Sequence, residues 1–141
     1  MAKATLEDAY ILLELEELKF SPAMEEAFAW FSRELAHSPT MSYKDFMKRY
    51  PEGSDAQRYV ARIGQFYETM GTLAKHGLVN TNLLFDRYGV QPFWEKLSFH
   101  TEHERKADPN VGNVLGENFE WLANQNQVWL KKHLKKMKKR K

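Results

Sequence analysis

The sequence contains no cysteine, which excludes disulfide bonds, thiolate catalysis and metal sites that need cysteine ligands. It also has no run of about 18 apolar residues, the length that a membrane-spanning helix requires. The first residues do not follow the signal-peptide pattern, in which a basic region precedes an apolar stretch and a cleavage site. We therefore expect a cytoplasmic protein with no membrane span.

The motifs of common catalytic sites are missing as well. The sequence has no glycine-rich phosphate loop, no Gly-x-Ser-x-Gly turn and no His-Glu-x-x-His pair. We therefore expect a protein that is not an enzyme and that needs no cofactor.

Aromatic residues, by contrast, are abundant. They make up 13% of 141 residues, within a composition that is 43% hydrophobic and 28% charged. This composition is typical of one soluble globular domain. The aromatic residues fall at helical spacings, which indicates a packed core rather than a ligand site.

The run from Ser54 to Leu97 carries the clearest helix signals in the chain. Its first apolar residues recur at spacings of three and four, which places them on one face of a helix. They are Tyr59, Val60, Ile63, Phe66, Tyr67, Met70, Leu73 and Ala74. Ser54 is a suitable N-cap, and Gly77 can adopt the left-handed conformation that often ends a helix. A short helix is expected over 80–88, and another beginning at Pro92.

Further helices are predicted on both sides of this run. Thr5 and Asp8 form a capping-box pattern before a helix over 6–20. Two more are expected over 22–35 and 43–50. The polar segment 101–112 is expected to be the longest connection, before a last helix that begins near residue 113. The sequence therefore predicts an all-α fold: a single-domain helical bundle of about six helices with a long C-terminal helix.

Three phrases in the central run carry a family resemblance: FYETMGTLAKHGLV, LLFDRYG and FWEKL. They resemble an uncharacterised bacterial helical family, the domain of unknown function 4760, over roughly residues 57–97. The resemblance implies an all-helical domain and supplies no catalytic residues. Many members of that family begin with a membrane-spanning segment, which is not found in this sequence.

Charge is distributed unevenly along the chain. Of 21 Lys and Arg residues, eight lie in 131–141, a segment without acids. The other 13 stand against 19 acidic residues, so 1–130 carries a net charge of −6 and 131–141 one of +8. We therefore divide the chain into a helical domain, 1–130, and a basic C-terminal extension, 131–141. The candidate polyanion-binding residues are Lys131, Lys132, Lys135, Lys136, Lys138, Lys139, Arg140 and Lys141.

On a helix, Leu130, Leu134 and Met137 would line one side of this extension, with lysines around them. Such a pattern suits nucleic-acid phosphates or an anionic membrane surface. Two alternatives remain open. The extension is a solvated tail, or it packs against the helix over 6–20 of its own or another subunit, whose exposed side is expected to be acidic.

The amide run 124–127 is unusual in the middle of a helix. One or two of these side chains must lie close to the apolar face, which leaves that turn weakly packed or supplies hydrogen bonds to a neighbouring helix.

Four charged residues of the central run are candidates for buried ion pairs. Glu68 and Glu95 lie in aromatic surroundings, with Arg62 and Arg87 as possible partners. A buried carboxylate would have a raised pKa, but a structural ion pair is the favoured interpretation over acid/base catalysis.

His100 and His103 are the weak candidates for a metal site. Their three-residue spacing places both on one helix face, near Glu104. Two histidines do not complete a site, and the polar surroundings favour solvent exposure. We therefore predict no bound metal.

These observations favour a non-catalytic helical interaction module, with a protein partner or a homo-oligomer as its contact. Self-association is one form of this hypothesis, because the surplus of apolar surface needs covering. The alternative is polyanion binding, to nucleic acid or anionic lipid, through the basic extension.

Overall fold

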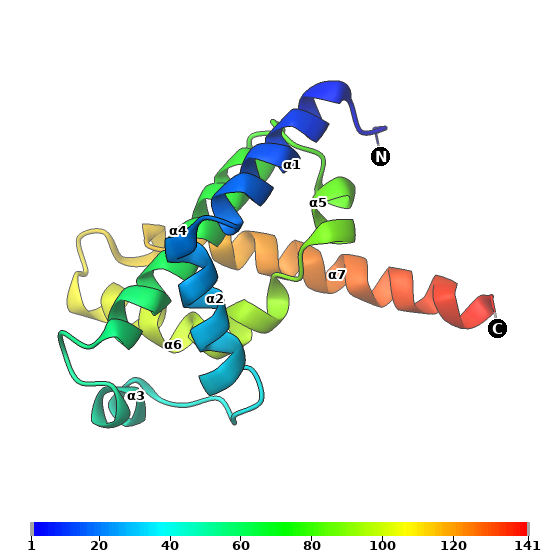
Figure 1. Cartoon of the computed structure of the whole chain (residues 1–141). Helices are drawn as coiled ribbons and strands as arrows, with labels where there is room; N and C mark the ends of the chain where they lie inside the picture. The colour runs from blue at the N-terminus through cyan, green and yellow to red at the C-terminus, as the bar shows by residue number, and fades with distance from the viewer. Residues whose placement is uncertain (1, 141) are drawn as a thin grey trace.

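The computed structural model describes residues 2–140, which form an all-α fold (Figure 1). This part of the chain contains seven α-helices, one 3₁₀ helix and no strand. The elements are α1 (Leu6–Lys19), α2 (Pro22–Glu34), α3 (Tyr43–Arg49), α4 (Asp55–Lys75), α5 (Thr81–Arg87), α6 (Gln91–Ala107), η1 (Gly112–Val114) and α7 (Glu117–Lys139). The predicted all-α single-domain fold with a long C-terminal helix is confirmed, with one α-helix more than the approximate six.

Helix α4 lies at the centre of the fold and packs most extensively against α7 and α2. The apolar stripe that the sequence predicted is buried, apart from Leu73, which is half-buried. Two small residues, Ala56 and Gly71, are also buried on α4.

Aromatic rings from four helices meet around Tyr67 of α4. Its ring centroid lies 6.2 Å from that of Phe28 on α2 and 5.0 Å from that of Phe93 on α6. Phe119 of α7 stacks on it at 5.2 Å. These aromatic residues therefore form the core, as their helical spacing predicted.

The predicted helix ends at Thr5 and Gly77 are confirmed. Thr5 and Asp8 form a reciprocal capping box at the start of α1. Gly77 has φ +72°, and the backbone N–H of Leu78 donates to Leu73 at 2.9 Å. The last bond is the mark of a Schellman motif, which reverses the chain directly after α4.

Helix α6 continues to Ala107, so the expectation of a long connection over 101–112 was wrong. Its last two turns are polar but consist mostly of good helix formers. Arg105 fixes them to the next segment, because its Nε donates to the carbonyl of Leu115 at 2.8 Å and its guanidinium pairs with Glu120.

The amide run does supply hydrogen bonds to a neighbouring helix. Asn126 is fully buried, and its Oδ1 accepts hydrogen bonds from the backbone N–H groups of Val90 and Gln91, each at 3.0 Å. The Asn126 side chain thus holds the start of α6 against the middle of α7.

Candidate functional sites

The basic extension is the continuation of α7, which crosses residue 130 without a break. We call Leu130–Arg140 the arm. Every residue from Lys131 to Arg140 is exposed, and Figure 1 shows the arm extending beyond the other helices. Seven of the eight predicted polyanion-binding residues lie on it, whereas Lys141 lies outside the described residues.

The arm has an apolar stripe as well as its cations. Leu134 and Met137 are 57% and 46% exposed, and Leu130 is half-buried where the arm leaves the body. Lys131, Lys135 and Lys138, at i, i+4 and i+7, run along one side of the helix. Such an exposed amphipathic helix is suited to covering, or being covered by, another apolar surface.

A groove of about 340 Å³ lies between α5 and α7 at the base of the arm. Phe85 and Trp129 form its aromatic side, with centroids 6.0 Å apart, and the His133 ring stacks on Trp129 at 4.7 Å. Lys132 and Lys136 line the same groove. Aromatic surface beside cations suits a ligand that carries both a planar base and phosphates.

The exposed side of α1 is apolar as well as acidic. Leu6, Tyr10 and Leu13, at i, i+4 and i+7, are 65%, 60% and 63% exposed, and we call them the α1 face. Leu15 lies on the opposite side of the helix, in the core. The exposed side of α1 is therefore not purely acidic, although the sequence had led us to expect an acidic side. Apolar residues occur all around α1, and the rest of the fold covers only one side of the helix.

A shallow groove of about 470 Å³ runs between α1 and α4 beside this face. Its lining is mostly apolar: Tyr10, Ile11, Leu15, Leu18 and Leu73, with Glu14 and Thr69. A second hollow of about 310 Å³ shares Leu18 and Thr69 with it, so the apolar depression continues along α4.

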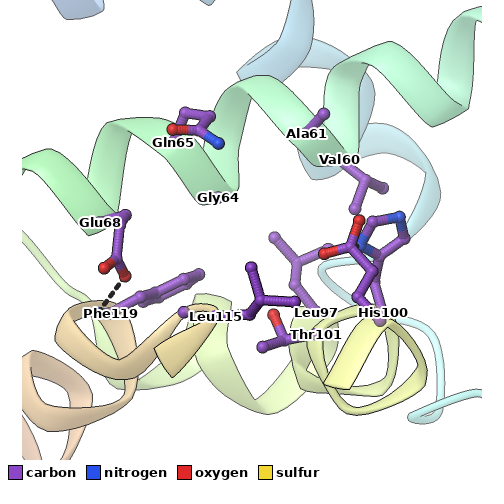
Figure 2. Close-up of a pocket in the computed structure, with 12 residues that line it drawn as sticks. Val60, Ala61, Gly64, Gln65, Glu68, Leu97, His100, Thr101, Leu115 and Phe119 are labelled. Carbon is purple, nitrogen blue, oxygen red and sulfur yellow. Dashed lines mark hydrogen bonds and ion pairs between the residues drawn. The ribbon is translucent and has the colours of Figure 1, made fainter. Parts of the chain in front are cut away.

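A smaller hollow of about 130 Å³, shown in Figure 2, lies between α4, α6 and the start of α7. Glu68 borders it, but its carboxylate accepts hydrogen bonds from the backbone N–H groups of Asn118 at 3.3 Å and Phe119 at 2.8 Å. These are the second and third residues of α7, so Glu68 caps that helix from another element. Both oxygens of the Glu68 carboxylate are thus used in a structural role at the start of α7.

His100 lines the same hollow and is largely buried. Burial lowers the pKa of its imidazole, and Glu104, with an oxygen 3.7 Å from Nδ1, acts in the opposite direction. His103 stacks on the Tyr43 ring at 3.5 Å, and the His100 ring lies 6.4 Å from the same tyrosine. No cluster within residues 2–140 has the side chains for a metal site.

The four candidates for buried ion pairs form no ion pair with one another. Glu95 is exposed and forms no ion pair within residues 2–140. Arg87 pairs instead with Glu16 of α1, its Nε lying 2.7 Å from the carboxylate. Arg62 lines the hollow that shares Leu18 and Thr69 with the α1–α4 groove, and it forms no ion pair with Glu68. The suggested pairing of these groups is therefore not found.

Sequence reasoning missed the α1–α4 groove and the capping role of Glu68. The three residues of the α1 face were visible at i, i+4 and i+7, but so were apolar residues on the other sides of the helix. No local signal marks Glu68, because its partners lie about 50 residues further along the chain.

Fold and surfaces together define an all-α, single-domain helical protein. The chain belongs to the family described as Domain of unknown function (DUF4760), whose family model matches residues 4–126. The resemblance noted over 57–97 is thereby confirmed over a longer stretch. No curated protein and no solved structure matches the chain. Among residues 2–140, no helix combines the length and the apolar character needed to cross a membrane.

Proposed function

We propose that this protein is a non-catalytic interaction module and that the arm is its contact element. The observation that carries the proposal is the arm itself, a helix whose residues from Lys131 to Arg140 are all exposed. A solvated helical end needs no apolar stripe, yet Leu134 and Met137 remain uncovered here. Burying them against a partner is favourable by about 25 cal/mol per Å² of apolar surface.

The engagement of polar groups elsewhere supports a non-catalytic role. The Glu68 carboxylate is occupied by two backbone N–H groups, and the His103 ring lies flat on Tyr43. Contacts within the fold thus occupy both side chains.

Polyanion binding is the second candidate function, and the groove at the base of the arm favours it. The stacked rings of Trp129 and His133 offer aromatic surface, while Lys132 and Lys136 offer charges for phosphates. Without a groove-reading element, such binding rests on phosphate charge and falls steeply with salt.

The test compares two full-length variants with equal loss of charge. The arm variant carries Lys132→Gln, Lys136→Gln and Lys138→Gln, and so removes both lysines that line the groove. The control variant carries Lys44→Gln, Lys48→Gln and Lys75→Gln, three exposed lysines of the body. Binding to duplex DNA, RNA and anionic vesicles is measured across a salt series, and self-association by sedimentation.

We expect the arm variant to lose at least tenfold in one of these four measurements, and the control variant to match the wild-type protein. Loss confined to a polyanion, with a steep salt dependence, selects the second candidate function. If the arm variant matches the wild-type protein in all four measurements, the arm is not a contact element and the proposal is wrong.

A further inference from the structure

The body of the molecule has an apolar surface that the chain itself leaves uncovered. The α1 face is more than half exposed at each of its three residues, Leu6, Tyr10 and Leu13. It adjoins the α1–α4 groove, which shares Tyr10 with it. Exposed apolar residues that adjoin an apolar groove are typical of a docking surface for another helix.

The arm matches this surface in length and polarity. Its eleven residues extend over about 16 Å, and the fourteen residues of α1 over about 21 Å, at 1.5 Å per residue. Its apolar stripe of Leu130, Leu134 and Met137 is of the size that a shallow groove between two helices accepts. An arm lying along α1 would bury both apolar stripes at once.

Charge makes the match specific. Glu7, Glu14 and Glu17 are exposed on α1 and form no ion pair within residues 2–140. Glu14 also lines the groove and is its only charged lining residue. The cations of the arm are likewise without an acidic partner in this part of the chain. Opposite charges on two otherwise complementary apolar surfaces fix both the partner and its direction.

The arm and the groove cannot meet within one chain as it is folded here. Helix α7 directs the arm away from the body, and Figure 1 shows its end far from α1. The arm is a rigid continuation of α7, so no loop allows it to turn back. A second copy of the chain supplies the missing surface without any change of fold.

We infer that the arm of one copy docks on the α1 face and α1–α4 groove of a second copy, with its lysines beside Glu7, Glu14 and Glu17. This inference rests on the proposed function of the arm as a contact element. Reciprocal docking gives a twofold dimer in which each copy provides one arm and one groove.

A charge-exchange experiment tests this pairing directly. The face-reversed variant carries Glu7→Lys, Glu14→Lys and Glu17→Lys, and the arm-reversed variant carries Lys131→Glu, Lys135→Glu and Lys138→Glu. Each variant alone brings like charges together, whereas a mixture of the two restores opposite charges at both contacts. Sedimentation equilibrium measures the mass of each sample against the 16.6 kDa monomer.

We expect the wild-type protein to dimerise, each variant alone to dimerise at least tenfold more weakly, and the equimolar mixture to recover the wild-type mass. A control with Glu25→Lys, Glu52→Lys and Glu102→Lys reverses three exposed acids elsewhere and should dimerise like the wild-type protein. Circular dichroism confirms that every variant is folded.

Other outcomes overturn the inference and separate it from the proposed function. If the wild-type protein stays monomeric, the arm does not dock on α1. The same conclusion follows if both charge-reversed variants dimerise as strongly as the wild-type protein. If the arm-reversed variant then loses binding to RNA or anionic vesicles, the arm is still a contact element and its partner is a polyanion. If neither mass nor polyanion binding responds to the arm, both proposals fail.

Discussion

Glu68 caps a helix that begins 49 residues after it: its carboxylate accepts the backbone N–H of Phe119 at 2.8 Å. The neighbouring N–H of Asn118 donates to the same carboxylate at 3.3 Å. Helix α7 lacks a cap of its own, because its N-cap is Gly116. The central helix therefore supplies the acceptor, and a negative charge, where the partial positive charge of α7 lies.

Replacing Glu68 should destabilise the fold, to an extent that depends on the substituted residue. Glu68→Ala removes both acceptors and should lower the free energy of unfolding by about 1–3 kcal/mol. Glu68→Gln keeps an acceptor and loses the charge, which should cost about 0.5–1 kcal/mol. Urea denaturation of both variants measures these losses. Exposed Glu95→Ala is the control, and a loss there equal to that of Glu68→Ala would contradict the capping role.

Gly71 sets how closely α4 approaches α7. A Cβ atom at this position would lie 2.3 Å from the backbone oxygen of Asn118, far inside van der Waals contact. Gly71→Ala should therefore destabilise the protein by about 2–4 kcal/mol, since backbone atoms must move apart.

Gly64 of the same helix provides a matched comparison. A Cβ atom there meets nothing within 4 Å. Gly64→Ala should consequently stabilise the protein by up to about 1 kcal/mol, through helix propensity alone. Thermal unfolding of the two variants measures the contrast, and equal effects at Gly64 and Gly71 would show that α4 and α7 are not in close contact.

Asn126 joins α7 to the start of α6 through a single oxygen. Asn126→Ala leaves the N–H groups of Val90 and Gln91 without this acceptor and creates a small cavity. The expected loss is about 2–4 kcal/mol, because buried donors without partners are costly. Asn124→Ala, on the exposed side of the same helix, should change stability by less than about 0.5 kcal/mol. Similar midpoints in urea for both variants would contradict this role.

The sequence was sufficient where the relevant interactions are local. The capping box of Thr5 and Asp8 and the left-handed turn at Gly77 involve residues only a few positions apart, so their patterns are legible in one dimension. The stripe along α4 was equally clear, because one side of that helix is apolar and the other is not.

Contacts between residues far apart in the chain could not be predicted from the sequence. The amides of 124–127 indicated hydrogen bonds to a neighbour, but only the packing of α7 on α6 selects Asn126. Similarly, α1 has apolar residues around most of its circumference, so periodicity could not tell that Leu15 is buried and Leu13 exposed. The docking surface that we propose consists of the apolar residues of α1 that stay exposed when the side with Leu15 packs into the core.

The Asp8 carboxylate ties the start of α1 to the start of α5. The backbone N–H of Thr5 donates to it at 2.7 Å and holds its pKa below the ordinary value of 3.8, although burial opposes this shift. The backbone N–H of Asn80, at 2.9 Å, lowers the pKa further. The folded protein thus binds this proton less readily than the unfolded chain. The ionised carboxylate stabilises the fold above pH 3.8, and this stabilisation is lost as the pH falls through the lower pKa of the folded state.

Asp8→Asn removes the charge but keeps an amide oxygen in place. At pH 7 the variant should be less stable than the wild-type protein, and the gap should narrow as the pH falls below about 4, since the wild-type carboxyl is then protonated as well. Urea midpoints at a series of pH values from 7 to about 2.5 measure the gap. Glu7→Gln, an exposed acid of the same helix, controls for the loss of one charge. A gap between Asp8→Asn and wild type that stays constant with pH would show that amide geometry, and not the charge of Asp8, holds α1 to Asn80.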